Sequence, residues 1–195
     1  MPYLHRVGNL DQLARVCGTA GYAAIAERRY REALAWLDEA LDAARRLDDP
    51  SELFAVHGNQ GLARLFLHEP DDAGQQFCDA LAVCREAGQE DDAGVDEALL
   101  GLAAVEASRG QLARAARLTG AAKAHQARRG FVDEQIVWSR VIDNIAPARH
   151  RYGPERWDLA EREGADLTRR DAIDLALERG RFARVATTSA AVAPH

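Results

Sequence analysis

The sequence has too little positive charge for a protein that binds nucleic acid. Lys123 is its only lysine, and the formal net charge is −6. Nucleic-acid binding needs clustered positive charge to neutralise phosphates. The two short basic clusters, Arg128-Arg129 and Arg149-His150-Arg151, are too small to provide it. We therefore expect no direct contact with nucleic acid.

Signals for a membrane or for a disulfide framework are also lacking. No apolar run approaches the ~20 residues of a membrane span, and the N-terminus lacks the basic start and apolar core of a signal peptide. The three cysteines, Cys17, Cys78 and Cys84, form no CxxC pair, which suits reduced thiols. The sequence therefore predicts a cytoplasmic protein that does not contact a membrane.

Patterns that support catalysis are missing as well. The six histidines have no HxxxH or HExxH spacing, and no GxxxxGK[ST] loop is present to cradle phosphates. The acidic run Glu90-Asp91-Asp92 lacks the DxDxDG spacing of a calcium loop. We therefore predict no enzyme, no metal site and no cofactor. A hydrolase that uses His57 or His68 is the least favoured alternative.

The residues that are abundant form helices. Alanine is the commonest residue, leucine, glutamate and arginine are plentiful, and only 6% of residues are aromatic. Because these abundant types have high helix propensity and β-branched residues are sparse, the composition predicts an all-α protein.

A motif at residues 30–41 recurs with weaker echoes along the chain. Anchoring on Ala33, Ala73 and Ala115 gives steps of 40 and 42 residues, and a period in this range indicates stacked repeats. A small residue precedes each anchor by 12 positions, which lets two antiparallel helices approach closely. These small residues are Gly21, Gly61 and Ala103, and large residues such as Tyr30, Leu34, Leu37 and Leu41 fill the remaining space.

The expected helices form three pairs followed by a different region. The pairs are Leu10–Glu27 with Tyr30–Leu47, Ser51–His68 with Ala73–Ala87, and Asp91–Arg109 with Leu112–Arg129. Ser51 is the expected N-cap of its helix, and residues 69–72 are expected to form a turn. The later helices are Val132–Arg151, which Pro147 kinks or ends early, Pro154–Gly164, and Arg169–Arg181 behind a Thr168–Asp171 capping box. We therefore expect three hairpins in residues 1–130, capping helices in residues 131–185 and a disordered tail in residues 186–195.

The repeated pattern resembles the tetratricopeptide repeat (TPR). The small and large positions of that repeat are matched in each copy. They are Gly21, Tyr30, Ala33, Leu37 and Ala40 in the first copy, Gly61, Ala73, Phe77 and Ala80 in the second, and Ala103, Ala115 and Ala122 in the third. The spacing departs from the usual 34 residues because the second helix of each copy is longer. The resemblance implies a right-handed superhelix of antiparallel helix pairs with C-terminal capping helices.

A second resemblance covers residues 110–177. The segment from Gly110 to Ala122, followed by Tyr152–Trp157 and Gly164–Ile173, is similar to the end of the repeat region in actinobacterial LuxR-type and AfsR-like ATPase transcriptional regulators. It implies a sensory or scaffolding module that follows a nucleotide-binding domain. The chain is then either a fragment of such a regulator or a stand-alone relative.

By the TPR resemblance, the first helix of each repeat lines a concave groove. The implied partner-binding residues are Arg15, Tyr22, Ile25, Leu62, Leu65, Phe66, Glu97 and Leu100. The expected function is a non-catalytic scaffold for protein–protein interaction within a bacterial regulator or signalling protein. The alternative is a sensor that closes the groove on an apolar small molecule. The sequence leaves three possible occupants of the groove: a protein or peptide partner, a helix of the same chain, or a second copy in a homodimer.

Overall fold

The protein is a stack of helical hairpins, as shown by a computed structural model that describes residues 9–129 and 136–178. Within these residues there is no strand. Three antiparallel pairs follow one another: α2 (Leu10–Ala26) with α3 (Tyr30–Leu47), α4 (Pro50–Phe66) with α5 (Pro70–Glu86), and α6 (Ala93–Ser108) with α7 (Leu112–Arg129). They are followed by α8 (Ile136–Tyr152), α9 (Pro154–Ala165) and helical residues 169–178. The predicted all-α class is confirmed.

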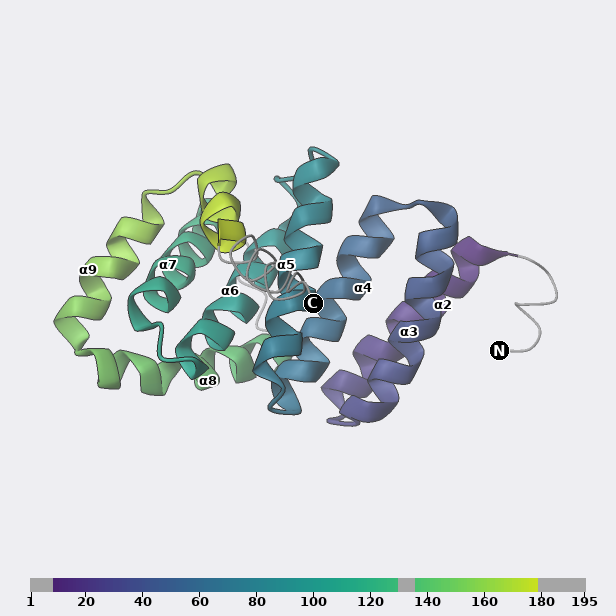
Figure 1. Cartoon of the computed structure of the whole chain (residues 1–195), viewed down its shortest axis with the longest axis horizontal. Helices are drawn as coiled ribbons and strands as arrows, with labels where there is room; N and C mark the ends of the chain where they lie inside the picture. Colours follow the sequence, from purple (N-terminus) through teal and green to yellow (C-terminus); the bar gives the residue numbers. More distant parts are fainter. Residues whose placement is uncertain (1–8, 130–135, 179–195) are drawn as a thin grey trace, which may run out of the picture.

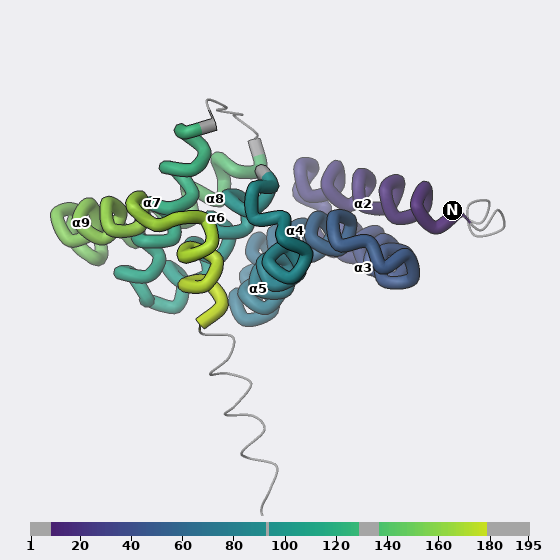
Figure 2. The backbone as a smooth tube through the Cα atoms, turned by 90° about the horizontal axis from the view of Figure 1, so that it is seen from above, coloured from purple at the N-terminus to yellow at the C-terminus, as the bar shows by residue number. Residues whose placement is uncertain are grey.

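The hairpins lie side by side in chain order, with α2 and α3 at one end and α9 at the other (Figure 1). The first helices contact one another in succession, α2 with α4 and α4 with α6, while α3 packs on α4 and α5 on α6. Viewed from above, α9 runs along α7 (Figure 2), against which it packs extensively. This is the stacking of a helical repeat, and the right-handed superhelix stays a prediction.

Prolines and aspartates set the starts of three helices. Pro50 and Pro70 occupy first-turn positions of α4 and α5, where a missing N–H costs nothing. The predicted start of α5 at Ala73 was therefore three residues late. Ser51 was wrong as the N-cap of α4, because the Asp49 carboxylate accepts the backbone N–H groups of Ser51 at 2.9 Å and Glu52 at 3.2 Å. Asp92 caps α6 in the same way.

The C-terminal helices follow the predicted order with one difference. Helix α8 continues through Pro147 to Tyr152. Pro147 is exposed, as is Asp143 four residues earlier, so water can satisfy the carbonyl that the proline leaves unpaired. The Thr168 cap is confirmed: its hydroxyl accepts the Asp171 N–H at 3.1 Å and donates to the Asp171 carboxylate at 2.6 Å. Residues 130–135 and the predicted tail, 186–195, lie outside the described residues.

The predicted pairing of small and large residues holds the first two hairpins together. A Cβ added to Gly21 would lie 2.6 Å from Leu37, and one added to Gly61 would lie 2.8 Å from Phe77. Leu37 and Phe77 are fully buried and occupy the same repeat position. Only glycine allows each large side chain to sit directly on the facing helix, so the small residues set the spacing within these hairpins.

Candidate interaction surface

The predicted groove residues lie on the three first helices but differ in exposure. Arg15 is exposed, and Tyr22, Phe66 and Glu97 are half-buried. The other four are buried, with exposed fractions of 0% for Ile25, 1% for Leu62, 7% for Leu65 and 2% for Leu100. The structure therefore brings the predicted set onto α2, α4 and α6, while leaving only half of it accessible in this conformation.

Helix α8 accounts for much of this burial at the α6 end. It packs against α6 and also touches α2 and α7. Its buried stripe recurs every three or four residues and consists of Val137, Val141, Ile145 and Ala148. Leu100 and Ala104 on α6 are correspondingly buried. A helix of the same chain thus occupies the surface of the third hairpin.

Arg140 of α8 connects this helix to the first two hairpins. Its guanidinium donates to the carbonyl oxygens of Ala26 at 2.9 Å and Ile25 at 3.5 Å, and to the Tyr30 hydroxyl at 3.3 Å. It also lies 5.6 Å from the centroid of the Phe66 ring, which stacks on Tyr30. A cation at the C-terminus of α2 complements the negative end of the helix dipole and the aromatic faces.

Sequence reasoning missed Arg140 because a single arginine on a helix is normally a solvated side chain. Its position directly before Val141, within an otherwise apolar stripe, was the available signal. Its contacts also show that two predicted groove residues, Ile25 and Phe66, already have a partner within the chain.

The surface over α2 and α4 remains accessible. Gly18 and Gly58 are 40 residues apart, half-buried, and a Cβ added to either would meet no atom within 4 Å. Neither glycine therefore serves helix packing, and neither has a positive φ. We call the surface around them the open groove; its exposed or half-buried residues are Arg15, Gly18, Tyr22, Ala55, Gly58 and Asn59.

A buried charged cluster joins α6, α7 and residues 169–178. Asp96 is fully buried, with one carboxylate oxygen 3.4 Å from His125 Nδ1 and the other 3.2 Å from the Arg169 guanidinium. The other ring nitrogen of His125 lies 3.1 Å from the Leu167 carbonyl. Both histidine nitrogens thus face oxygen atoms. We interpret the cluster as a structural contact that holds residues 167–178 against α6 and α7.

A second cluster surrounds Glu106, also on α6. The buried carboxylate lies 3.4 Å from Arg109 and 3.7 Å from Arg114. Arg114 in turn donates to the Ala176 carbonyl at 3.0 Å, and Arg109 pairs with Asp71 of α5 at 2.7 Å. Sequence reasoning missed both clusters. Their signal was that Asp96 and Glu106 are carboxylates in a helix, α6, whose other residues are small or apolar apart from Glu97 and Ser108.

The cysteines and histidines singled out in the sequence show no catalytic arrangement. Burial raises the pKa of the Cys17, Cys78 and Cys84 thiols to about 11, so they are protonated and weakly nucleophilic at neutral pH. His57 Nδ1 lies 2.7 Å from Gln76 Oε1, and His68 is an exposed residue after α4. Across the described residues, no three metal-ligating side chains cluster, and no helix is long and apolar enough to cross a membrane.

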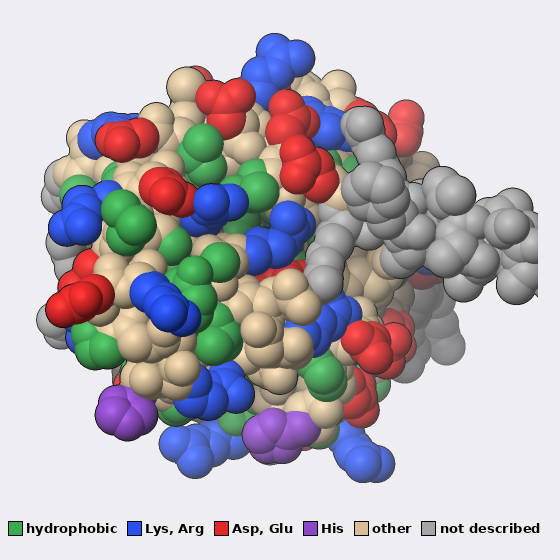
Figure 3. All heavy atoms as spheres, turned by 60° about the vertical axis from the view of Figure 1, so that its left-hand side comes forward, with side chains coloured by type: hydrophobic (Ala, Val, Ile, Leu, Met, Phe, Trp, Pro, Cys, Tyr) green, Lys and Arg blue, Asp and Glu red, His purple; other side chains and the backbone are tan. Residues whose placement is uncertain are grey.

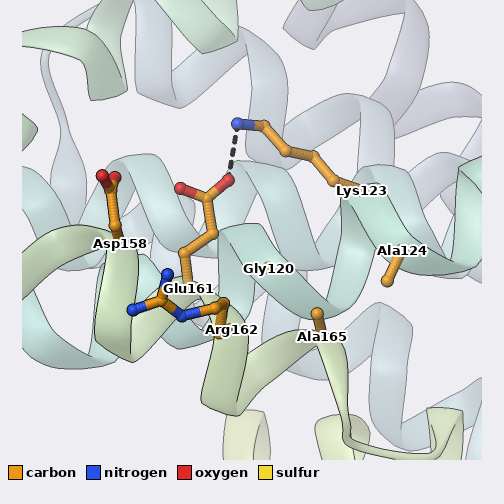
Figure 4. Close-up of a pocket in the computed structure, with 7 residues that line it drawn as sticks. All are labelled: Gly120, Lys123, Ala124, Asp158, Glu161, Arg162 and Ala165. Carbon is orange, nitrogen blue, oxygen red and sulfur yellow. Dashed lines mark hydrogen bonds and ion pairs between the residues drawn. The ribbon is translucent and has the colours of Figure 1, made fainter.

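A hollow of about 460 Å³ lies between α7 and α9, away from the predicted groove (Figure 4). Lys123 and Glu161 form an ion pair of 2.8 Å across it, and Asp158 and Arg162 complete its charged lining. Seen from the α9 end, acidic and basic side chains are interspersed over the surface (Figure 3). The hollow therefore offers neither an apolar pocket nor a concentrated patch of one charge.

Comparison with protein families, with curated proteins and with solved structures finds no match to this chain.

Proposed function

We propose that this chain is a non-catalytic helical-repeat scaffold that binds a protein or peptide partner in the open groove. The observation that carries the proposal is the pair Gly18 and Gly58, which face open space at the same repeat position on adjacent first helices. A glycine in a helix interior costs roughly 0.5–1 kcal/mol relative to alanine. Packing among the described residues does not offset that cost, and a partner that approaches the backbone closely would account for it.

The chemistry of the open groove suits a helix or an extended peptide. Tyr22 offers an aromatic face, Asn59 an amide, and Arg15 a charge at the edge. A few polar groups around a small-residue surface provide orientation while the close approach provides contact area. From the resemblance of residues 110–177 to the end of the repeat region in bacterial transcriptional regulators, we further propose a role as a regulatory or sensor module within such a protein.

The test is selection of binding peptides from a displayed library against the full chain, followed by affinity measurement. Replacing Gly58 or Gly18 with arginine fills the open groove without touching the core, because no atom lies near either Cβ position. We expect Gly18→Arg and Gly58→Arg to weaken binding of selected peptides by about tenfold or more. The matched control is Ala35→Arg, on an exposed position of the second helix α3, which should bind normally.

Circular dichroism and urea unfolding would establish that each variant is folded. Selected peptides that bind Gly58→Arg and Gly18→Arg as tightly as the native chain would exclude the open groove as their site. The alternative function, sensing of an apolar small molecule, predicts a different pattern. In that case a metabolite panel would raise the thermal midpoint while no peptide does.

A further inference from the structure

Helix α8 contacts the C-terminal ends of the first helices of all three hairpins. Near its start, Arg140 donates to the carbonyl of Ala26, the last residue of α2. Near its end, Arg151 donates at 2.8 Å to the carbonyl of Ala107, one residue before α6 ends. The Arg140 guanidinium also lies 5.6 Å from the centroid of the ring of Phe66, the last residue of α4. In Figure 1, α8 accordingly runs along the lower edge of the stack.

The two arginines of α8 are spaced to reach from α2 to α6. They are eleven residues apart in one helix. Their side chains therefore leave α8 in directions only about 20° apart, at points about 16 Å apart along its axis. Helices α2, α4 and α6 contact one another in succession. Because packed helices lie roughly 8–10 Å apart, the separation of α2 from α6 is on the order of 16–20 Å, which matches the spacing of the arginines.

Arginine is the residue type that suits these contacts. The last carbonyl groups of a helix have no partner within the helix, and they form the negative end of its dipole. A guanidinium is a cation with five N–H donors in a planar fork, so one side chain can bind several groups at once. Arg140 binds the carbonyls of Ile25 and Ala26 on α2 and the hydroxyl of Tyr30 on α3. It therefore holds both helices of the first hairpin.

The rest of α8 is attached to the third hairpin. Its buried stripe lies against this part of the molecule, because α8 packs mainly on α6 and also contacts α7. The second hairpin, α4 with α5, stands between the first and the third. Helix α8 is therefore a second, direct link between the first and third hairpins, anchored by apolar packing at one end and held by Arg140 at the other.

We propose that α8 is a spacer helix, which fixes the distance between the first helices and thereby sets the width of the open groove. The stripe and Arg151 hold it on α6, and Arg140 holds the end of α2 at a distance set by the length of α8. Arg140 is then a positioning residue, because it acts on partner binding through the placement of α2. This consequence for binding rests on the proposed function, since the open groove lies over α2 and α4.

The first test measures the distance between the first and third hairpins by electron spin resonance. Spin labels are attached to Ala35→Cys on α3 and to Gln111→Cys between α6 and α7, both at exposed positions. The native thiols react slowly, because burial raises their pKa to about 11, and the chain without added cysteines checks this. We expect Arg140→Ala to shift and broaden the distance distribution. Arg140→Lys should have an intermediate effect, because lysine keeps the charge but lacks the fork.

The matched control for this measurement is Arg149→Ala. Arg149 is on the same helix, but it pairs with Asp158 of α9 instead of the first helices, so its loss should leave the distance unchanged. Urea unfolding would confirm that each variant is folded. A contribution of Arg140 to stability alone would lower the free energy of unfolding without changing the distance. An unchanged distribution in folded Arg140→Ala, or an equal change in Arg149→Ala, would overturn the spacer role.

The second test measures the affinity of peptides selected on the open groove. Their dissociation constant should rise about threefold or more in Arg140→Ala, because only the molecules that retain the native spacing bind at full strength. Arg149→Ala should bind normally. Unchanged affinity in Arg140→Ala despite a shifted distance distribution would overturn the control of the groove by α8. If no selected peptide is sensitive to Gly58→Arg, the proposed function fails, and the distance measurement by itself still decides whether α8 is a spacer.

Discussion

The two ends of the helical stack differ in how far other helices cover them. At the C-terminal end, α9 covers α7, and residues 169–178 attach to α5, α6 and α7 through Arg85–Asp174, Arg169–Asp96 and the Arg114 bond to the Ala176 carbonyl. At the other end, α2 exposes Val16 at a position that is buried in the next hairpin. Among the described residues, other helices therefore cover the stacking surface at the C-terminal end and not at the α2 end.

The means of attachment also differ between the ends. The first two hairpins are held by apolar contacts in which Gly21 and Gly61 receive Leu37 and Phe77. The C-terminal segment depends in addition on carboxylates that are buried in α6 and paired with arginines and a histidine. Buried ion pairs fix orientation more than they add stability, since both charges lose hydration. They therefore suit the docking of a short segment in one register.

The largest expected effect is at the crossing of α7 and α9. A Cβ added to Gly120 would overlap the Glu161 carbonyl oxygen, and Gly164 faces the Arg117 carbonyl in the same way. Gly120→Val must therefore separate the two helices. We expect the free energy of unfolding in urea to fall by about 4 kcal/mol or more. Gly58→Ala is the control, because its open surroundings should allow a gain of about 0.4–1 kcal/mol. Equal behaviour of the two variants would refute the close crossing.

An intermediate effect is expected from Asp96→Ala. This variant removes the buried carboxylate shared by His125 and Arg169 and leaves the half-buried arginine only its pair with the exposed Asp91, so unfolding should become easier by about 3 kcal/mol. Hydrogen exchange should show that amides in residues 172–177 lose protection first. Glu163→Ala, which breaks an exposed pair with Arg117, should change stability by less than about 1 kcal/mol. Unchanged hydrogen-exchange protection of residues 172–177 would show that Asp96 does not hold this segment in place.

The smallest expected effects come from shortening the valine at the same repeat position in two hairpins. Val56→Ala removes buried methyl groups and should cost about 2 kcal/mol. Val16→Ala, at a site that is 41% exposed, should cost less than about 0.5 kcal/mol in urea unfolding. If the two costs are similar, then Val16 is covered and the contrast between the ends is lost.

Much of the fold could be predicted because it is encoded locally. Helix Tyr30–Leu47 and helix Leu112–Arg129 have the predicted bounds, and the pairing of Gly61 with Phe77 follows from the repeat period. The errors at Ser51 and Ala73 arose where a proline could either end a turn or begin a helix. Asp49 decided the first case, because its carboxylate satisfies the free N–H groups of the first turn.

The candidate site was predicted less well, and the reason is the distance along the chain between its partners. The resemblance to TPR arrays placed eight residues on the first helices, yet the bonds of Arg140 reach carbonyls 114 and 115 residues away. No period or spacing in the sequence encodes such a contact. The open groove could be located only once the Cβ surroundings of Gly18 and Gly58 were known.

The amino-acid sequence by itself determined the helices and their pairing into hairpins, because propensity, capping and the small–large pattern act over a few turns of chain. The tertiary structure alone decided which surfaces those hairpins leave accessible. Helix α8 lies on α6, and Asp96 receives Arg169 from 73 residues away. These contacts bury part of the predicted groove while Val16 remains exposed. Exposure is a property of the packed molecule, and identical apolar positions acquire different roles according to what packs against them.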